Sequence, residues 1–538
     1  MNRFFTYRLS DKLSCKLSLY SLSLLLMLFA LLKSSIAFGA PDCTADALIS
    51  ETFSNGAKWE MCWESRIREN LVLSDVYYTP PNGVAKRVLS TARLSQLHVA
   101  YDDSDVTYND ITQYGLGGGY MVSLDQSDCP LGKLLTIQTR PGVCHWRSQG
   151  NDNYRTPSRS VSAESLTLFS VSQVGAYAYI VTWKFFSDGA ISPEVGATGA
   201  LQRSSENTEL PFGRLLSGSD KNLWLSHTHN YYWRLDFDLG DNANDDVVTE
   251  SRTLLQDTGQ RETVVQRFAT EQARVVDPKT PMAWEIWDNL LTDTPGADDS
   301  GYRIEPIRYG HRLERKEKEP YTEFDFFVTV ANDCERFASQ NARFNPDCLN
   351  NVAQYANGES LLSADLVLWH RVSFHHVPRD EDQRHMHTHW DGFTIEPLNI
   401  HKNTPGINID ANSAPSLDNL DNRNDQLGTR IVWQLVANDV DGDGIAFEGT
   451  NLPDGLALNY RGVIEGTPTV PGNYTVTIKA TDDIATTEKQ FNWVIDGKGG
   501  EVTSRGFLGS TSAVVLLLFS LIVLTRIFNR IELTQRRS

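Results

Sequence analysis

Between Trp59 and about Ile400 the sequence repeats one pattern, in which short segments rich in β-branched and aromatic residues alternate with clusters of Gly, Asp, Asn and Pro. AYAYIVTWKFF and YYWRLDFDL are typical of these segments. Apolar residues at every second position form one face of a half-buried strand, and no long segment here has the period of a helix. The pattern predicts an all-β fold whose main part is one large antiparallel β-sandwich.

A second, smaller unit is predicted after the Pro/Gly/Asn-rich connector NTPGINIDAN. It contains the short strand-like segments RIVWQLVAND, LALNYRG, NYTVTIKATD and KQFNWVID, which have the spacing of a small β-sandwich. The segment resembles the immunoglobulin- and cadherin-like modules of bacterial surface proteins. Four of its acidic residues are either oxygen ligands for calcium or parts of a solvated acidic turn: Asp439, Asp441, Asp443 and Asp482.

Both ends of the chain carry apolar runs that predict export. Basic residues, an apolar run from Leu17 and small residues up to Ala40 have the order of a signal peptide, with a retained membrane anchor as the alternative. Residues 506–525 carry no charge and are long enough for a transmembrane helix, or for a removable sorting signal, and four arginines follow. The positive-inside tendency then places the bulk of the chain outside the cytoplasm, anchored in the cell envelope, either periplasmic or at the cell surface.

These segments divide the chain into seven predicted parts. In order they are a signal peptide at 1–40, the large domain at 41–402, a linker at 403–413, the small immunoglobulin-like sandwich at 414–496, a linker at 497–505, the transmembrane helix or sorting signal at 506–525 and a basic cytoplasmic tail at 526–538.

The charge balance argues against nucleic acid as a partner. The chain has 49 Lys and Arg against 68 Asp and Glu, a formal net charge of −19, and no basic patch precedes its last residues. Of seven cysteines, Cys15 lies in the predicted leader and six remain, an even number that favours disulfides in an oxidising compartment. Six cysteines allow fifteen connectivities. Pairing of sequence neighbours is the hypothesis adopted: Cys43 with Cys62, Cys129 with Cys144, and Cys334 with Cys348.

The histidines gather in two segments, which suggests a metal site. His227 and His229 stand two apart in SHTHNYYWRLDFD, so on a strand both imidazoles point to one face. WHRVSFHHVPRDED and RHMHTHW carry a second group: His375, His376, His385, His387 and His389. Three neutral imidazoles from two strands suit copper, zinc or iron(II).

The stretch VGAYAYIVTWKFFSDGAISPEVGATGALQ closely resembles the segment of copper amine oxidases in which a tyrosine is converted into topaquinone. By position that tyrosine is Tyr177. HTHNYYWRLDFD and DLVLWHRVSFHHVPRDED are similar to the family's copper-binding segments, which implies His227, His229 and His376 as copper(II) ligands. TYNDITQYGLGGG is similar to the segment of the catalytic aspartate, which implies Asp110 as the base and places Tyr108 beside the cofactor.

The resemblance covers residues 55–400 approximately and carries further implications. It implies a disulfide between Cys129 and Cys144, and a homodimer. It also implies a peripheral calcium or manganese site, whose pattern falls on Asp236, Asp238 and Asp365 with the carbonyls of Phe237 and Leu366.

The activity that this resemblance implies is the oxidation of primary amines by O₂ to aldehydes, with release of hydrogen peroxide and ammonia. The family has Asn before its quinone tyrosine and Asp or Glu after it, whereas this chain has Ala176 and Ala178. Alanine side chains cannot hold the ring by hydrogen bonds. Two alternatives therefore stand beside the oxidase: a copper-binding or sensing protein without quinone formation, and a structural or adhesive surface protein that uses the sandwich module for binding.

Overall fold

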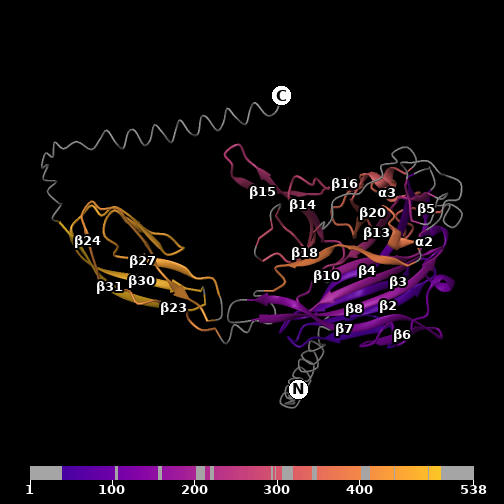
Figure 1. The fold of residues 1–538 in the computed structure, drawn as a ribbon, viewed down its shortest axis with the longest axis horizontal. Coiled ribbons are helices and arrows are strands. Elements are labelled where there is room, and N and C mark those ends of the chain that lie inside the picture. Colours follow the sequence, from indigo (N-terminus) through magenta and orange to yellow (C-terminus); the bar gives the residue numbers. More distant parts are fainter. Residues whose placement is uncertain are drawn as a thin grey trace, which may run out of the picture. The chain divides into compact units, whose positions relative to one another are not determined.

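The computed structural model describes residues 39–497 apart from 103–106, 156–159, 202–212, 218–222, 241, 293–294, 297, 306–318, 342–347, 384, 402–411, 441–442 and 483. Contacts divide the chain into two compact units after Asn408 (Figure 1). The predicted signal peptide, except its last two residues, lies outside the described part, as do the C-terminal apolar run and the basic tail. Among the described residues, no helix has the length and hydrophobicity needed to cross a membrane.

The first unit contains two large sheets in which all strands pair antiparallel. One sheet runs in the order β1 (Leu48–Thr52), β2 (Lys58–Arg66), β3 (Asn70–Thr79), β4 (Lys86–Tyr101), β13 (His227–Phe237), β20 (Leu366–His376), β19 (Phe326–Val330) and β16 (Gln272–Arg274), with β5 (Thr107–Asn109) beside β4.

The other sheet runs in the order β15 (Arg261–Arg267), β14 (Val247–Leu255), β17 (Met282–Trp287), β18 (Gly301–Glu305), β22 (Thr394–Leu398), β10 (Ile191–Gly199), β9 (Tyr177–Phe186), β8 (Ser160–Val174), β7 (Arg140–Arg155) and β6 (Lys133–Ile137), with β21 (Met386–Gly392) beside β10. A two-stranded sheet joins β11 (Gly213–Leu215) to β12 (Leu223–Leu225). The helices described are short: α2 (Asp110–Gln113), α3 (Val352–Tyr355), and the 3₁₀ turns η1 (Gly118–Tyr120), η2 (Pro320–Glu323) and η3 (Asp380–Asp382).

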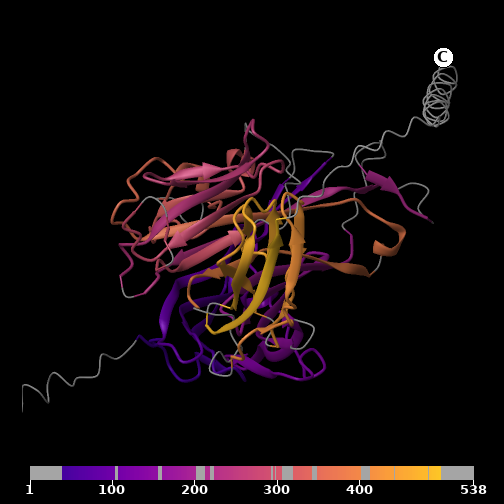
Figure 2. The same ribbon diagram turned by 90° about the vertical axis from the view of Figure 1, so that its left-hand side faces the viewer.

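The two large sheets pack face to face and share one hydrophobic core (Figure 1, Figure 2). Alternate residues of β9, from Tyr177 to Phe185, are buried as the sequence pattern requires. Trp183 of β9 meets Trp233 of β13 edge-on, with 5.0 Å between the ring centres. The prediction of an all-β antiparallel fold is confirmed for this unit.

Strand β13 is the central strand of the site. All eleven of its residues are buried, because its odd-numbered side chains face the shared core and its even-numbered side chains face a second cluster that includes Tyr232, Tyr355 and Trp369. His227 and His229 lie at the start of the strand on the same face as Trp233, the face that packs on β9.

Tyr177 is placed at the start of β9 by a tight turn. Val174 pairs with Tyr177, so only Gly175 and Ala176 connect β8 to β9. Gly175 has φ of +60°, which suits the first position of a two-residue hairpin turn. On the other side Tyr177 pairs with Gly199, whose φ is +105°. This pairing also requires glycine, because a Cβ on Gly199 would lie 2.4 Å from the carbonyl oxygen of Ala176.

Three disulfides join the six cysteines of the described chain. They link Cys43 to Cys62, Cys129 to Cys144, and Cys334 to Cys348. The predicted pairing of sequence neighbours is therefore confirmed. The Cys129–Cys144 bridge joins β7 to the loop before β6, and it is buried together with Leu124.

The second unit is a small β-sandwich with its own core around Ile464, Ile478 and Trp493. Its sheets have the orders β24 (Arg423–Gln426), β31 (Thr486–Asp496), β30 (Gly472–Thr481), β27 (Ala446–Thr450) and β25 (Ile431–Gln434), β29 (Val463–Gly466), β28 (Leu456–Leu458), and β23 (Ser416–Leu417) pairs with β26 (Ala437–Asn438). The Asp482 carboxylate accepts hydrogen bonds from the N–H groups of Ile484 and Ala485, which is the arrangement of a turn. Asp441 lies outside the described residues.

The pairing of Tyr177 with Gly199 gives a stability prediction. We expect Gly199→Ala to lower the free energy of unfolding by more than Gly259→Ala, a matched change in the β14–β15 turn. Both positions have positive φ, which costs about 1–3 kcal/mol for alanine, but a Cβ at Gly259 meets nothing within 4 Å. Urea unfolding followed by tryptophan fluorescence measures both. Equal losses would contradict the steric role of Gly199.

Candidate metal and amine-oxidation site

The pairing of β13 with β20 brings the three predicted copper ligands together. His227 stands opposite His376 in this register, and His229 stands opposite Phe374. The ring centre of His227 lies 4.8 Å from that of His229 and 5.1 Å from that of His376. All three side chains are buried, at 1–2% exposure.

The hydrogen-bond partners of these rings assign which nitrogens carry lone pairs. His227 Nδ1 lies 3.2 Å from the carbonyl oxygen of Leu225, which only accepts, so Nδ1 carries the proton and Nε2 the lone pair. His376 Nε2 lies 3.1 Å from the Asp382 carboxylate and donates to it, which leaves the lone pair on Nδ1. That Nδ1 is buried without a partner, as are both ring nitrogens of His229.

The imidazoles are held in the neutral form that metal binding requires. Burial lowers the pKa of His227 to about 3, with a further contribution from His376. Burial also lowers the pKa of His229 and of His376. A buried polar atom without a partner costs about 1–3 kcal/mol, and this cost applies to Nδ1 of His376 and to the ring nitrogens of His229. Nε2 of His227 accepts a hydrogen bond from the Tyr177 hydroxyl. Three neutral imidazoles with one lone pair each fit copper(II).

Tyr177 lies against this group. Its hydroxyl donates to Nε2 of His227 over 2.8 Å, and its ring centre is 5.3 Å from that of His229. Burial raises the pKa of Tyr177 well above its ordinary value, so the phenol is protonated here. The neighbouring Ala176 offers only its backbone carbonyl, which accepts from the N–H of Ala200.

The ring of Tyr179 connects Asp110 to Tyr177. Its carboxylate accepts a hydrogen bond of 3.0 Å from the hydroxyl of Tyr179, whose ring stacks on that of Tyr177 with 6.1 Å between centres and 11° between planes. Burial raises the pKa of Asp110 to about 7, although the Tyr179 hydrogen bond opposes the rise. Tyr108 is half-buried on β5, where it packs edge-on against Tyr101.

Tyr101 and Asp382 belong to the site but were not among the predicted residues. Tyr101 pairs with His227 across β4 and β13, and its ring centre lies 5.0 Å from that of His227. Only the pairing of β4 with β13, which local sequence patterns do not reveal, brings it there. Asp382 orients His376 and is itself held by Arg379. The acidic residues that follow His376 in the sequence were a usable signal for this contact.

The remaining histidines of the second segment divide between surface and site. His375 points away from the ligand group and bonds to Asp102 over 2.9 Å. His385 and His387 are exposed. His389 lies against His376, with 4.7 Å between ring centres. A β-bulge in β21 explains why His389 faces inward while His387 is exposed. His389 pairs with Ala197 and Met386 with Gly199, so β21 has one more residue than β10 over this stretch. The extra residue breaks the every-second-residue pattern.

The predicted calcium or manganese residues gather near the other end of β13. Asp236, Asp238 and Asp365 each have one buried carboxylate oxygen without a hydrogen-bond partner. Burial raises the pKa of Asp365 to about 6, and repulsion from Asp236 adds to the rise. Phe237 and Leu366 adjoin these carboxylates in the chain and are buried. Carboxylates in this state fit a hard cation.

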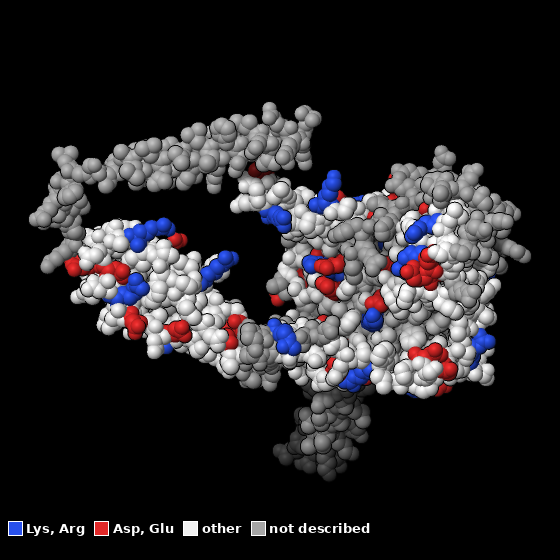
Figure 3. Space-filling view, viewed as in Figure 1, with Lys and Arg blue, Asp and Glu red and all other residues white. Residues whose placement is uncertain are grey.

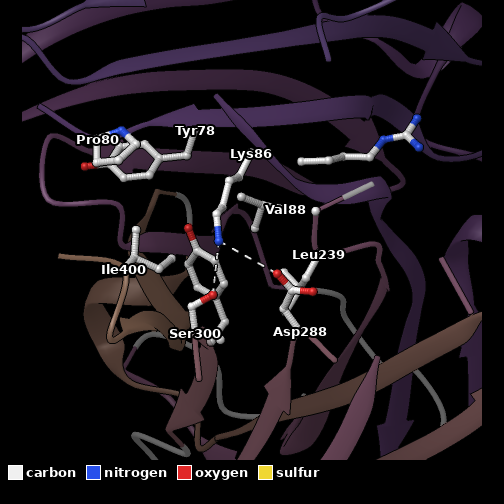
Figure 4. Close-up of a pocket in the computed structure, with 12 residues that line it drawn as sticks. Tyr78, Pro80, Lys86, Val88, Leu239, Asp288, Ser300 and Ile400 are labelled. Carbon is white, nitrogen blue, oxygen red and sulfur yellow. Dashed lines mark hydrogen bonds and ion pairs between the residues drawn. The ribbon is translucent and has the colours of Figure 1, made fainter. Parts of the chain in front are cut away.

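A small cavity lies beyond this carboxylate group (Figure 4). Lys86 projects into it and is placed 3.7 Å from the Asp288 carboxylate and 3.3 Å from the Ser300 hydroxyl. Leu239 and Gly240, which follow β13, contribute to its wall. Because β13 spans eleven residues at about 3.4 Å each, the cavity lies roughly 30 Å from the histidines. It takes no part in the site around Tyr177.

Comparison with known proteins identifies two sequence families. A family model described as copper amine oxidase, enzyme domain, matches residues 139–415, which is more than half of the chain, and a model described as a putative Ig domain matches residues 414–496. A primary amine oxidase of Pisum sativum is 23% identical over 394 residues, which cover 65% of this chain and 58% of that protein. A primary amine oxidase of Klebsiella aerogenes is 26% identical over 405 residues, which cover 64% and 52%.

Solved structures show the same fold. A copper-containing benzylamine oxidase from Hansenula polymorpha matches with a TM-score of 0.56 at 17% identity, covering 66% of this chain and 61% of that one. An Aspergillus nidulans amine oxidase matches with a TM-score of 0.55 at 21% identity, covering 69% and 55%. This chain therefore spans a little over half the length of these relatives.

The contact between His376 and Asp382 generates a prediction. We expect Asp382→Asn to weaken copper(II) binding about 10–100-fold, because the carboxylate fixes the ring orientation and keeps the proton on Nε2. Glu381→Gln, an exposed position in the same turn η3, is the matched control and is expected to bind as the unchanged chain does. Competition with a chelator of known affinity measures both. Equal affinities for the two variants would contradict this role of Asp382.

Proposed function

The chain belongs to the copper amine oxidase family, and we propose from this premise that it oxidises primary amines to aldehydes with copper(II) and a topaquinone made from Tyr177. O₂ would be the oxidant, and hydrogen peroxide and ammonia the further products. One observation carries the proposal: the Tyr177 hydroxyl is buried 2.8 Å from Nε2 of His227, beside His229 and His376, whose ring nitrogens include buried ones without a hydrogen-bond partner.

Some residues of the site would bind the metal, and others would orient the reacting groups. His227 through Nε2, His376 through Nδ1 and His229 would hold copper. The quinone supplies the electrophile that condenses with the amine and accepts its electrons. Tyr179 stacks on Tyr177 and would restrict the orientation of its ring. The side chains of Ala176 and Ala178 cannot do this, because they form no hydrogen bonds.

Asp110 is the proposed general base. It would take the proton from the carbon that bears the amine nitrogen, so it must be ionised when the substrate is in place. A carboxyl group whose pKa is raised by burial to about 7 is a strong enough base for this step near neutral pH. Its hydrogen bond to Tyr179 fixes the carboxylate beside the ring that stacks on Tyr177.

The carboxylate group near the far end of β13 supports a second proposed cation. Calcium or manganese would bind Asp236, Asp238 and Asp365, with the backbone carbonyls of Phe237 and Leu366 completing the site. A divalent ion would relieve the mutual repulsion that helps to raise the pKa of Asp365. This ion would have a structural role, because it lies far from Tyr177.

The cellular context is proposed from the sequence alone. The predicted leader and C-terminal apolar run support export, with anchorage in the cell envelope. A homodimer is proposed because copper amine oxidases typically form dimers. Amine identity stays open. Acidic and basic side chains are interspersed on the face seen in Figure 3, so the net charge of −19 would steer cationic amines only weakly and in a salt-dependent way.

A copper-binding protein without quinone is the second candidate. The observation that favours it is the pair Ala176 and Ala178, which removes the polar side chains that flank the quinone tyrosine in the family. The metal ligands do not depend on these positions. The two candidates therefore differ in whether Tyr177 is converted.

Quinone formation distinguishes the candidates directly. We expect the purified full-length chain, loaded with copper and incubated in air, to stain in a redox-cycling quinone assay and to form a coloured adduct with phenylhydrazine. Tyr177→Phe is expected to lose both signals, whereas Tyr460→Phe, an exposed position in the second unit, keeps them. Bound copper without stain or adduct in the unchanged chain would exclude the oxidase and support the second candidate.

The pKa of Asp110 predicts the pH dependence of turnover. The base works when ionised, so kcat/KM should rise with pH, reach half of its maximum near the pKa of Asp110 at about 7, and level off above it. Tyr179→Phe removes a hydrogen bond that lowers the pKa of Asp110, so the rise should move to higher pH. Asp110→Asn should still form the quinone but lose about 10²–10⁴-fold in kcat/KM.

Peroxide release measured from pH 5 to 9 checks these values. A profile that is unchanged in Tyr179→Phe would separate this hydrogen bond from catalysis. Undiminished turnover in Asp110→Asn would remove Asp110 from the role of base.

A further inference from the structure

His389 provides a fourth imidazole beside the three predicted ligands. It comes from β21, in the sheet opposite β13 and β20, and the β-bulge in β21 between Met386 and His389 allows His389 to face inward while His387 is exposed. His376, Asp382 and His389 each offer one potential donor atom within 4.8 Å of the others.

One ring nitrogen of His389 lacks a hydrogen-bond partner. Nε2 of His389 is buried without a hydrogen bond, in the same condition as Nδ1 of His376. The His389 ring is stacked on Phe374 at 4.7 Å, which limits its rotation.

The carboxylate of Asp382 is already used by hydrogen bonds, so His376 and His389 are the donors left for a metal ion in this group. One carboxylate oxygen accepts from Nε2 of His376 and from the backbone N–H of Arg379, and the other accepts from the Arg379 guanidinium. Nε2 of His376 therefore carries a proton. The nitrogens left without a hydrogen bond are Nδ1 of His376 and Nε2 of His389.

We propose that His389 is a fourth imidazole ligand of the metal ion held by His227, His229 and His376. Two imidazoles on one ion, with metal–nitrogen bonds of about 2.0–2.1 Å, have ring centres on the order of 5 Å apart. The measured spacings are 4.8, 5.1 and 4.7 Å for His227–His229, His227–His376 and His376–His389. Four nitrogens suit the tetragonal preference of copper(II). The proposal rests on the copper site of the proposed function.

The test counts imidazoles rather than activity. Full-length chain is loaded with one equivalent of copper(II) and measured by electron paramagnetic resonance, with pulsed detection of the remote imidazole nitrogens. The variants are His389→Gln, His389→Phe, which keeps an aromatic ring on Phe374, and His387→Gln as the matched exposed control. Circular dichroism and thermal unfolding of the metal-free forms check that each variant folds.

We expect both His389 variants to lose one imidazole from the copper spectrum and to bind copper at least about tenfold more weakly, since even outer-shell changes cost 10–100-fold. The His387 control should match the unchanged chain. Spectrum and affinity that persist in both His389 variants would overturn the proposal. If a titration beyond one equivalent shows that the His389 variants lose only a second copper ion, with the spectrum of the first unchanged, His389 belongs to a separate site and the proposal is also overturned. Failure of the unchanged chain to bind copper would refute the proposed copper site itself.

Discussion

The register between β13 and β20 is the constraint on which the site depends. It places His227 opposite His376 and turns His229 to the same face, toward β9. A slip of one residue would turn this face over and present Thr228 and Asn230 to Tyr177 instead. The register is strongly specified because β13 is buried on both faces. A slip would also move Trp233 out of the shared core and away from Trp183.

Burial gives the two ends of β13 opposite chemical characters. At the first end it keeps the imidazoles neutral, so nitrogen donors lie beside Tyr177. Near the other end it crowds Asp236, Asp238 and Asp365, so hard oxygens accumulate without enough partners. Each arrangement costs free energy in the metal-free protein, and a bound cation would offset that cost. One strand thereby supports two proposed metal sites of different kinds.

Sequence patterns predicted those parts of the structure that depend on local spacing. The alternation in AYAYIVTWKFF gave the buried face of β9, and the spacing of His227 and His229 gave their common face. Contacts that depend on register between distant strands were not predictable in this way. Tyr101 reaches His227 only through the β4–β13 pairing, and His389 turns inward only because a bulge interrupts the two-residue period of β21.

The central claim is that copper binds where His227, His229 and His376 converge beside Tyr177. Anomalous diffraction from crystals of the copper-loaded chain, recorded on both sides of the copper absorption edge, tests it most directly. The account predicts a single strong peak within bonding distance of about 2.0–2.1 Å from Nε2 of His227 and Nδ1 of His376. A copper peak at another position, or none between these rings in crystals shown by elemental analysis to contain copper, would contradict it.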